Sequence, residues 1–304
     1  MDVESFYAEL RRGPDEVDRT ASQLADIRAC NNFVKAVLFA RFVPKEMPVR
    51  VFDWACGKGG DFFKLTRLFP SMEAYTGIDL TRKSIDDFYA RTDQGRKLPV
   101  GLQFTIDAQD LRTFVPSPYG PKYSVLSCQF AFHYFCETYE TVRDTLARMA
   151  SVLCTGGRIL ITTPRPDEIR ARLRPVGSPG RMEMRIINPT SLDLKCRIVC
   201  VPGQRAYFFE LIEGANSFAV QAPEFFVEQS LLDRAAREVG LQIVFQKGLG
   251  RFLEESRESF ESLAHVFKLP KSLEPDDREI LELYNVIVLE KTPMIQLAPQ
   301  LNFM

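Results

Sequence analysis

The sequence is poor in histidine and has no paired-cysteine motif, which argues against a metal centre. Its 304 residues contain two histidines, His133 and His265, and seven cysteines, none of them in a Cys-x-x-Cys pair. Structural zinc sites use closely spaced cysteine and histidine ligands of that kind. We therefore expect no bound metal, and we expect the cysteines to be reduced thiols of an intracellular protein.

Neither sign of charge dominates, and no apolar run is long enough to span a membrane. The 39 basic and 40 acidic residues leave a net charge of −1. A protein that covers a long stretch of nucleic-acid backbone should be basic, so extended non-specific binding is disfavoured, whereas a local phosphate site is not. The start, Met1-Asp2-Val3-Glu4, lacks the basic residues of a signal peptide, and we expect no membrane partner.

What the chain does have is an alternation of apolar strands and amphipathic helices up to residue 164. Such alternation is typical of an α/β fold with a mostly parallel sheet. The patterns predict a first helix over 21–42 and five strands over 49–55, 74–79, 102–106, 123–130 and 158–163. They also predict a helix from about residue 60 to residue 68, which stops near Pro70.

Residues 165–222 interrupt this rhythm. They are rich in proline, glycine, arginine and β-branched residues, which predicts an inserted set of antiparallel strands. We expect a single domain over 21–291, between a polar arm at 1–20 and a tail at 292–304. After the insertion the patterns predict a helix over 224–239 that Pro223 opens, a strand over 241–248, a helix over 252–267 and a strand over 283–290.

A glycine-rich turn stands where the first predicted strand meets its helix. Residues 51–61 read Val-Phe-Asp-Trp-Ala-Cys-Gly-Lys-Gly-Gly-Asp, and Asp79 ends the next apolar strand. Glycines let the backbone approach a ligand, and an acid at this place accepts hydrogen bonds from ribose hydroxyls, so the unit suits a nucleoside-bearing cofactor. The spacing differs from the Gly-x-Gly-x-x-Gly of dinucleotide enzymes, which argues against an NAD dehydrogenase. It resembles the S-adenosylmethionine loop of class I methyltransferases, and so implies a Rossmann-like fold with a seven-stranded sheet.

Further motifs follow in a fixed order along the chain. They are Asn-Asn-Phe-Val-Lys at 31–35, Ser-Cys-Gln-Phe-Ala-Phe-His-Tyr at 127–134, Thr-Thr-Pro at 162–164 and Pro-Glu-Phe at 223–225. Together with the glycine loop, this series resembles the mRNA cap guanine-N7 methyltransferases over residues 31–291. The run at 127–134 carries most of the specificity, because ordinary class I methyltransferases lack it.

The resemblance implies a set of contacts to S-adenosylmethionine. Asp79 would hold the ribose, and Asp107 would take the adenine amine, with Asp110 as the alternative. Lys35 would pair with the methionine carboxylate. Ala55 stands where the family commonly has glycine, and its extra methyl group narrows the cofactor site. The expected cofactor-binding residues are Lys35, Asp53, Ala55, Gly57, Asp79, Asp107, Gln129 and Tyr134.

The resemblance also implies an acceptor, the terminal guanine of GpppRNA. One carboxylate can accept from both N1–H and the N2 amine of guanine, and Glu224 resembles the family's guanine-reading acid. An acid in the first turn of a helix is also favoured by the helix dipole alone. The insertion would form part of the acceptor pocket, where Phe208 replaces an acid that relatives often carry. The expected cap-binding residues are His133, Glu224 and Tyr284, with Asn31 and Asn32 at the cap nucleoside and Lys58, Lys64 and Arg91 at the phosphates.

The implied reaction is an in-line attack of guanine N7 on the sulfonium methyl, which yields m7GpppRNA and S-adenosylhomocysteine. N7 carries a free lone pair, so we expect no general base; His133, Tyr134 and Glu224 would position the reactants. Two alternatives are a methyltransferase for a small-molecule acceptor and a non-catalytic subunit that binds RNA or a partner enzyme. The resemblance alone implies nuclear residence and contact with other mRNA capping enzymes or RNA polymerase II.

Overall fold

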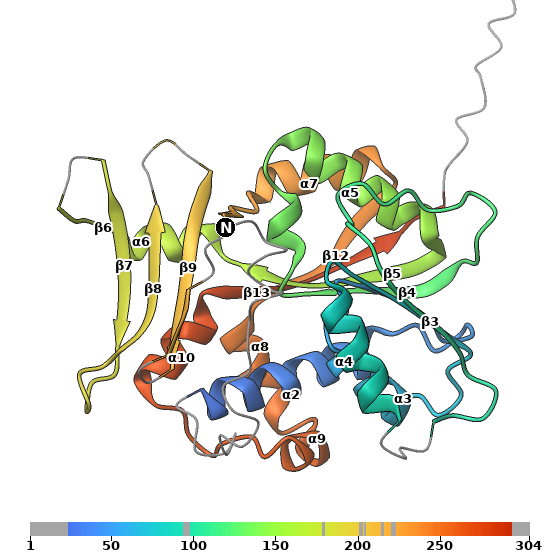
Figure 1. The fold of residues 1–304 in the computed structure, drawn as a ribbon, viewed down its shortest axis with the longest axis horizontal. Coiled ribbons are helices and arrows are strands. Elements are labelled where there is room, and N and C mark those ends of the chain that lie inside the picture. The colour runs from blue at the N-terminus through green and yellow to red at the C-terminus, as the bar shows by residue number, and fades with distance from the viewer. Residues whose placement is uncertain are drawn as a thin grey trace, which may run out of the picture.

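The computed structural model describes residues 24–93, 98–177, 180–200, 203, 205–213, 216–219 and 223–293. The arm expected at 1–20 lies outside these ranges, and so does the expected tail beyond residue 293. Within them the chain forms two β-sheets, and Figure 1 shows helices on both faces of the larger one.

The larger sheet has seven strands and is mostly parallel. They span Arg50–Trp54 (β1), Ala74–Asp79 (β2), Gln103–Ala108 (β3), Tyr123–Gln129 (β4), Leu153–Pro164 (β5), Leu241–Gly248 (β12) and Tyr284–Lys291 (β13). Their order is β12-β13-β5-β4-β1-β2-β3, in which β13 alone runs antiparallel to its neighbours β5 and β12. The predicted Rossmann-like sheet is confirmed.

Two helical layers bury the sheet from both sides (Figure 1). Within β1, Val51 packs into one apolar cluster, and Phe52 and Trp54 pack into the other. Because both faces are covered, the central strands read as nearly continuous apolar runs. One layer consists of α2 (Ala25–Phe42), α3 (Gly60–Leu68), α4 (Arg82–Thr92), α8 (Leu249–Arg257), α9 (Glu261–Val266) and α10 (Pro275–Glu282), and the other of α5 (Tyr139–Val152) and α7 (Gln229–Glu238).

The insertion forms most of the second sheet, as predicted, and residues 224–225 add one more strand to it. Its strands are antiparallel and span Arg174–Pro175 (β6), Met182–Ile187 (β7), Leu194–Cys200 (β8), Ala206–Glu213 (β9), Asn216–Ala219 (β10) and Glu224–Phe225 (β11). Tyr207 and Phe209 are buried on one face of β9, whereas Phe208, between them, is 45% exposed. The departure from the family at Phe208 therefore falls on the face turned away from the core. A short helix, α6 (Pro166–Arg172), precedes the sheet and was not predicted.

The chain after the insertion differs from the prediction in two places. Glu224 and Phe225 pair with Tyr207 and Ala206 of β9, and α7 begins only at Gln229. The predicted helix over 224–239 is therefore wrong at its start, because the open edge of β9 binds the backbone of these residues. Glu224 consequently lies in a strand and gains nothing from a helix dipole.

The predicted helix over 252–267 is also wrong, because two helices occupy that range. α8 ends at Arg257, and Phe260, with φ of −128°, precedes α9 and interrupts the helical geometry. α10 was not predicted. No helix among the described residues is both long enough and apolar enough to cross a membrane.

Candidate cofactor and acceptor site

The glycine turn between β1 and α3 is fixed by backbone geometry. Gly57 and Gly59 have φ of 51° and 70°, which L-residues rarely adopt. A Cβ at Gly59 would lie 2.1 Å from the Phe88 ring, so only glycine fits there. The Gly57 N–H donates to Asp79 Oδ2 at 2.8 Å, and this bond ties the turn to the end of β2.

Ala55 is strained in the same turn. Its φ is 67°, in the left-handed region that costs an L-residue roughly 1–2 kcal/mol. The glycine that the family commonly carries at this position would avoid this cost.

Replacing Ala55 with glycine is therefore expected to stabilise the protein. The relieved strain exceeds the extra freedom that glycine gives the unfolded chain, about 0.5–1 kcal/mol, so we expect a net gain of up to about 1 kcal/mol. Denaturant unfolding measures it. Ala147→Gly in the ordinary helix α5 is the matched control and should lose about 1 kcal/mol. A destabilised Ala55→Gly variant would contradict the assignment of strain.

A cavity of about 460 Å³ opens at the carboxyl ends of the strands, beside this turn. Its volume falls in the range of small-molecule and cofactor sites. Gln129 donates from Nε2 to the Leu160 carbonyl at 2.9 Å, while its Oε1 is buried with no hydrogen-bond partner among the described residues. Such an orphaned acceptor fits a cofactor that donates to it. The lining contains five of the expected cofactor residues, namely Ala55, Gly57, Asp79, Gln129 and Tyr134.

Of the two candidate acids after β3, the one that lines the cavity is Asp110. Asp107 is exposed, is absent from the lining, and accepts hydrogen bonds from its neighbours Ala108 and Gln109. Arg112 donates to both oxygens of Asp110, and this lowers the pKa of the Asp110 carboxyl. The alternative acid is thus the better placed of the two.

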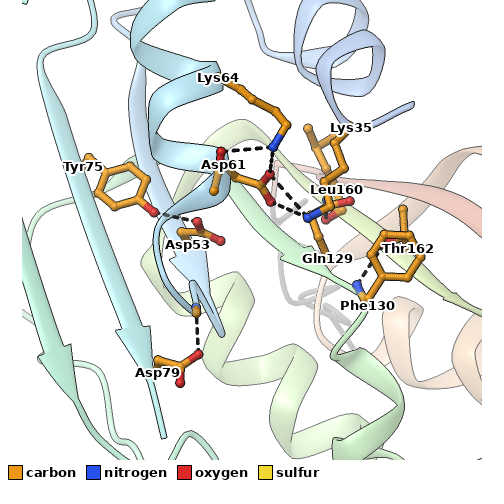
Figure 2. Close-up of polar contacts among 12 residues, drawn as sticks. Lys35, Asp53, Asp61, Lys64, Tyr75, Asp79, Gln129, Phe130, Leu160 and Thr162 are labelled. Atoms are coloured by element: carbon orange, nitrogen blue, oxygen red, sulfur yellow. Dashed lines mark hydrogen bonds and ion pairs between the residues drawn. The ribbon is translucent and has the colours of Figure 1, made fainter. Parts of the chain in front are cut away.

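Lys35 and Lys64 flank one buried carboxylate, that of Asp61 (Figure 2). Lys35 Nζ lies 3.0 Å from Asp61 Oδ2, and Lys64 Nζ lies 2.9 Å from Oδ1. Burial would raise the pKa of Asp61, but the two cations outweigh it and lower that pKa to about 2. Two cations on one anion leave a net positive charge beside the expected site of the methionine carboxylate.

Asp53 lies deeper in the structure. Tyr75 donates to Asp53 Oδ2 at 2.5 Å, and burial, reinforced by the charge of Asp61, raises the pKa of Asp53 to about 7. Asp53 is buried below the turn and does not line the cavity.

The expected acceptor residues His133 and Glu224 meet in the interior. Their side chains are only 4% and 5% exposed, and His133 Nε2 lies 3.5 Å from Glu224 Oε2. Tyr134 donates to Glu224 Oε1 at 3.2 Å, which joins the acceptor acid to the wall of the cofactor cavity. Neither ring nitrogen of His133 has a hydrogen-bond partner among the described residues. Buried polar groups such as the His133 nitrogens normally find a partner in a ligand or in water. His133 and Glu224 lie behind the wall of the cofactor cavity and are not part of its lining.

Tyr284 stands at the start of β13 with two aromatic neighbours that the sequence analysis did not assign to the site. The Phe130 ring lies 5.2 Å from it, edge to face, and the Phe209 ring 6.3 Å from it. Phe130 has φ of 56°, and Lys35 Nζ lies 5.5 Å from its ring centre. Strain in a bulky residue at such a place marks functional sites. The motif at 127–134 contains Phe130, but nothing in the sequence discloses its backbone angle.

The three residues expected to bind the phosphates do not all lie together. Lys64 and Arg91 line a second cavity of about 360 Å³ beside α3, together with Asn32, which was expected at the cap nucleoside. Lys58 lies outside both cavity linings and pairs with Asp87 at 2.6 Å. Asn31 Oδ1 is buried and has no partner among the described residues. Asp61, which holds Lys64 in place, is a further residue that the sequence analysis left unassigned, although it ends the glycine motif.

All seven cysteines are free, and six of them are buried. No group of three His, Cys, Asp or Glu side chains within the described ranges is arranged to hold a metal ion.

Solved structures share this fold. The methyltransferase CcbJ from Streptomyces caelestis matches with a TM-score of 0.58 at 14% identity, over 86% of this chain and 96% of that one. The plantazolicin methyltransferase BpumL, solved in complex with S-adenosylhomocysteine, matches with a TM-score of 0.55 at 15% identity, over 96% and 94% of the two chains. These likenesses show that the chain has the class I methyltransferase fold.

The sequence places the chain more narrowly. The mRNA (guanine-N(7))-methyltransferase domain matches residues 1–292, and the chain belongs to this family. The mRNA cap guanine-N(7) methyltransferase of Schizosaccharomyces pombe is 27% identical over 79% of this chain and 66% of its own length. For mRNA cap guanine-N(7) methyltransferase 1 of Oryza sativa subsp. japonica the identity is 28%, over 90% of this chain and 77% of the relative. The chain thus spans about two thirds to three quarters of the length of these relatives.

Proposed function

We propose that this chain transfers the methyl group of S-adenosylmethionine to N7 of the terminal guanine of GpppRNA. The products are m7GpppRNA and S-adenosylhomocysteine. The observation that carries the proposal is the buried Glu224 carboxylate, which Tyr134 joins to the cofactor cavity in a chain of the cap methyltransferase family.

On the cofactor side, we assign roles by position in the cavity. Asp79 accepts from the ribose hydroxyls, Asp110 takes the adenine amine, and Gln129 offers its orphaned Oε1. Lys35 faces the methionine carboxylate and shares its charge with Asp61. S-adenosylmethionine, once held there, supplies an electrophilic methyl group.

On the acceptor side, Glu224 takes the N1–H and N2–H donors of guanine, and His133 and Tyr284 contact the purine. Methylation leaves the purine cationic, and a buried carboxylate together with aromatic faces stabilises such a charge. Because Glu224 is fixed in a paired strand, it is organised before the substrate arrives.

The chain removes no proton from its nucleophile, because N7 has a free lone pair at neutral pH. His133 therefore acts as a positioning residue and not as a base. Alignment of the reacting atoms contributes on the order of 7–11 kcal/mol when it is good, and the rigid carboxyl edge of the sheet supplies that alignment.

The proposed substrate also bears on the cellular location and the partners of the protein. GpppRNA arises during mRNA capping, so we propose nuclear residence and contact with other mRNA capping enzymes or RNA polymerase II. Support for this comes from the family alone.

Transfer of labelled methyl from S-adenosylmethionine to GpppRNA tests the proposal. Digestion to m7GpppN should recover all the label on N7 of the cap. Label on a small acceptor with GpppRNA untouched would establish the small-molecule alternative, and cofactor binding without any transfer would establish a non-catalytic subunit.

A further inference from the structure

The cavity beside α3 is lined by apolar residues as well as by the cations that a triphosphate would contact. Its volume is about 360 Å³, and α2, α3, α4 and α9 all contribute to its walls. The walls from α2, α3 and α4 carry the cations Lys64, Arg67 and Arg91, together with Asn32 and the Phe63 ring. The wall from α9 and the residue after it is apolar and contains Leu263, Val266 and Phe267.

The cationic side is suited to phosphate. No carboxylate lines the cavity, although Lys64 is held by Asp61 behind it. Arg67 is exposed in the last turn of α3 and makes no ion pair with any described residue. Arg91 donates to the Lys58 carbonyl at 2.5 Å, which holds its guanidinium at the wall next to the Phe63 ring.

The apolar side is suited to a planar ring. None of the residues of α9 is buried, and Val266 is 46% exposed in spite of its apolar side chain. Phe267 follows directly and is half-buried. A phosphate chain makes no use of such a wall, whereas a nucleobase can stack on it.

A series of side-chain contacts links the acceptor residues to the wall of this cavity. Tyr284 packs on Phe130, the Phe130 ring lies beside Lys35, and Lys35 shares Asp61 with Lys64. In the proposed complex Lys35 remains with the methionine carboxylate, and the phosphates that start at the guanine reach the cavity at Lys64.

We propose that this cavity binds the first transcribed nucleotide of the capped RNA, with its base against Phe267 and its 3′ phosphate at Arg67. The inference rests on the proposed function and adds to it a second nucleotide site. Such a second site makes the enzyme prefer a capped RNA end over free GTP, because GTP has a guanine and a triphosphate but no second nucleoside.

The test compares three acceptors, GTP, GpppA and a capped decamer that begins GpppA. In the wild-type protein KM should fall from GTP to GpppA, and fall again for the decamer at low salt. Phe267→Ala should raise KM for GpppA at least about fivefold, because stacking on an aromatic ring is lost, and should leave KM for GTP unchanged. Phe267→Tyr keeps the ring and should restore the preference.

Arg67→Ala addresses the phosphate half of the site. It should raise KM for the decamer while KM for GTP and GpppA stays the same, and it should reduce the slope of log KM against log salt by about one. Arg67→Lys should retain most of that slope. Arg237→Ala, an exposed arginine on α7 in the opposite helical layer, is the matched control and should change none of the three.

The outcomes separate the two proposals. Absence of methyl transfer to every guanine acceptor would overturn the proposed function itself. Transfer to all three with equal KM, or variants at Phe267 and Arg67 that affect GTP as strongly as GpppA and the decamer, would overturn the second nucleotide site and leave the function standing.

Discussion

Replacing Glu224 with glutamine is expected to lower kcat/KM for GpppA by about 10³-fold. In the proposed complex the carboxylate accepts two hydrogen bonds from guanine, and bonds to a charged group contribute roughly 1.5–3 kcal/mol each. Glutamine keeps the size of the side chain but presents an amide N–H donor where a second acceptor is needed. The loss should be large because Glu224 is buried, and water cannot replace the missing partner.

A cap that contains inosine separates recognition from general damage. Inosine lacks the N2 amine, so the wild-type protein should prefer GpppA to IpppA, and the glutamine variant should not distinguish them. Glu183→Gln is the matched control, because Glu183 is equally buried in the second sheet but pairs with Arg181 and Arg185. Equal activity of wild-type and Glu224→Gln proteins on GpppA would refute the assigned role.

Much of the fold could be predicted because local signals and tertiary packing agree. α3 and β2 begin and end where expected, since glycine, proline and a terminal acid mark their limits. Glu224 shows the opposite case. Pro223 followed by an acid is a strong local signal for a helix start, but the edge of β9 competes for the same backbone and wins. No property of residues 223–225 by themselves reveals that edge.

The functional site also has features that the sequence predicts and features that only the tertiary structure decides. Parallel strands end at one edge of a sheet, so the gathering of Asp79, Gln129 and the glycine turn could be foreseen. Which acid reaches the cavity could not be foreseen, because the turn after β3 places Asp110 there instead of Asp107. The pairing of Lys35 with Asp61 joins two elements 26 residues apart, and only the packing of α2 on α3 brings them together.

Replacing Asp79 with alanine is expected to weaken cofactor binding by at least about 10²-fold. In the proposed complex two ribose hydroxyls lose a charged acceptor, at roughly 1.5–3 kcal/mol for each bond. The Gly57 N–H also loses the partner that holds the turn. Titration calorimetry with S-adenosylhomocysteine measures the change in Kd. Asp79→Asn keeps one acceptor oxygen and should fall between the alanine variant and the wild type.

A variant at Asp79 could lose cofactor affinity either directly or because the protein is less stable. The pKa of Asp79 predicts how the stability of the ligand-free protein changes. Burial raises this pKa above its ordinary value, although bonds from the Gly57 and Thr81 backbones oppose the shift. A carboxyl whose pKa is higher in the folded than in the unfolded protein destabilises the fold when ionised, and the cost grows as pH rises between the two values. Near neutral pH, Asp79→Asn removes that cost, so the ligand-free variant should unfold no earlier than the wild type.

Stabilisation by S-adenosylhomocysteine then distinguishes the wild-type protein from the Asp79→Ala variant. At 100 times its Kd, S-adenosylhomocysteine should stabilise the wild type by about 2.7 kcal/mol, and the same concentration should stabilise the alanine variant hardly at all. Asp86→Ala removes an exposed carboxylate that pairs with Arg82 on α4, and should behave as the wild type in both measurements. If Asp79→Ala bound S-adenosylhomocysteine with wild-type affinity, the ribose would have to lie elsewhere, and the cavity at the end of β2 could not be the cofactor site.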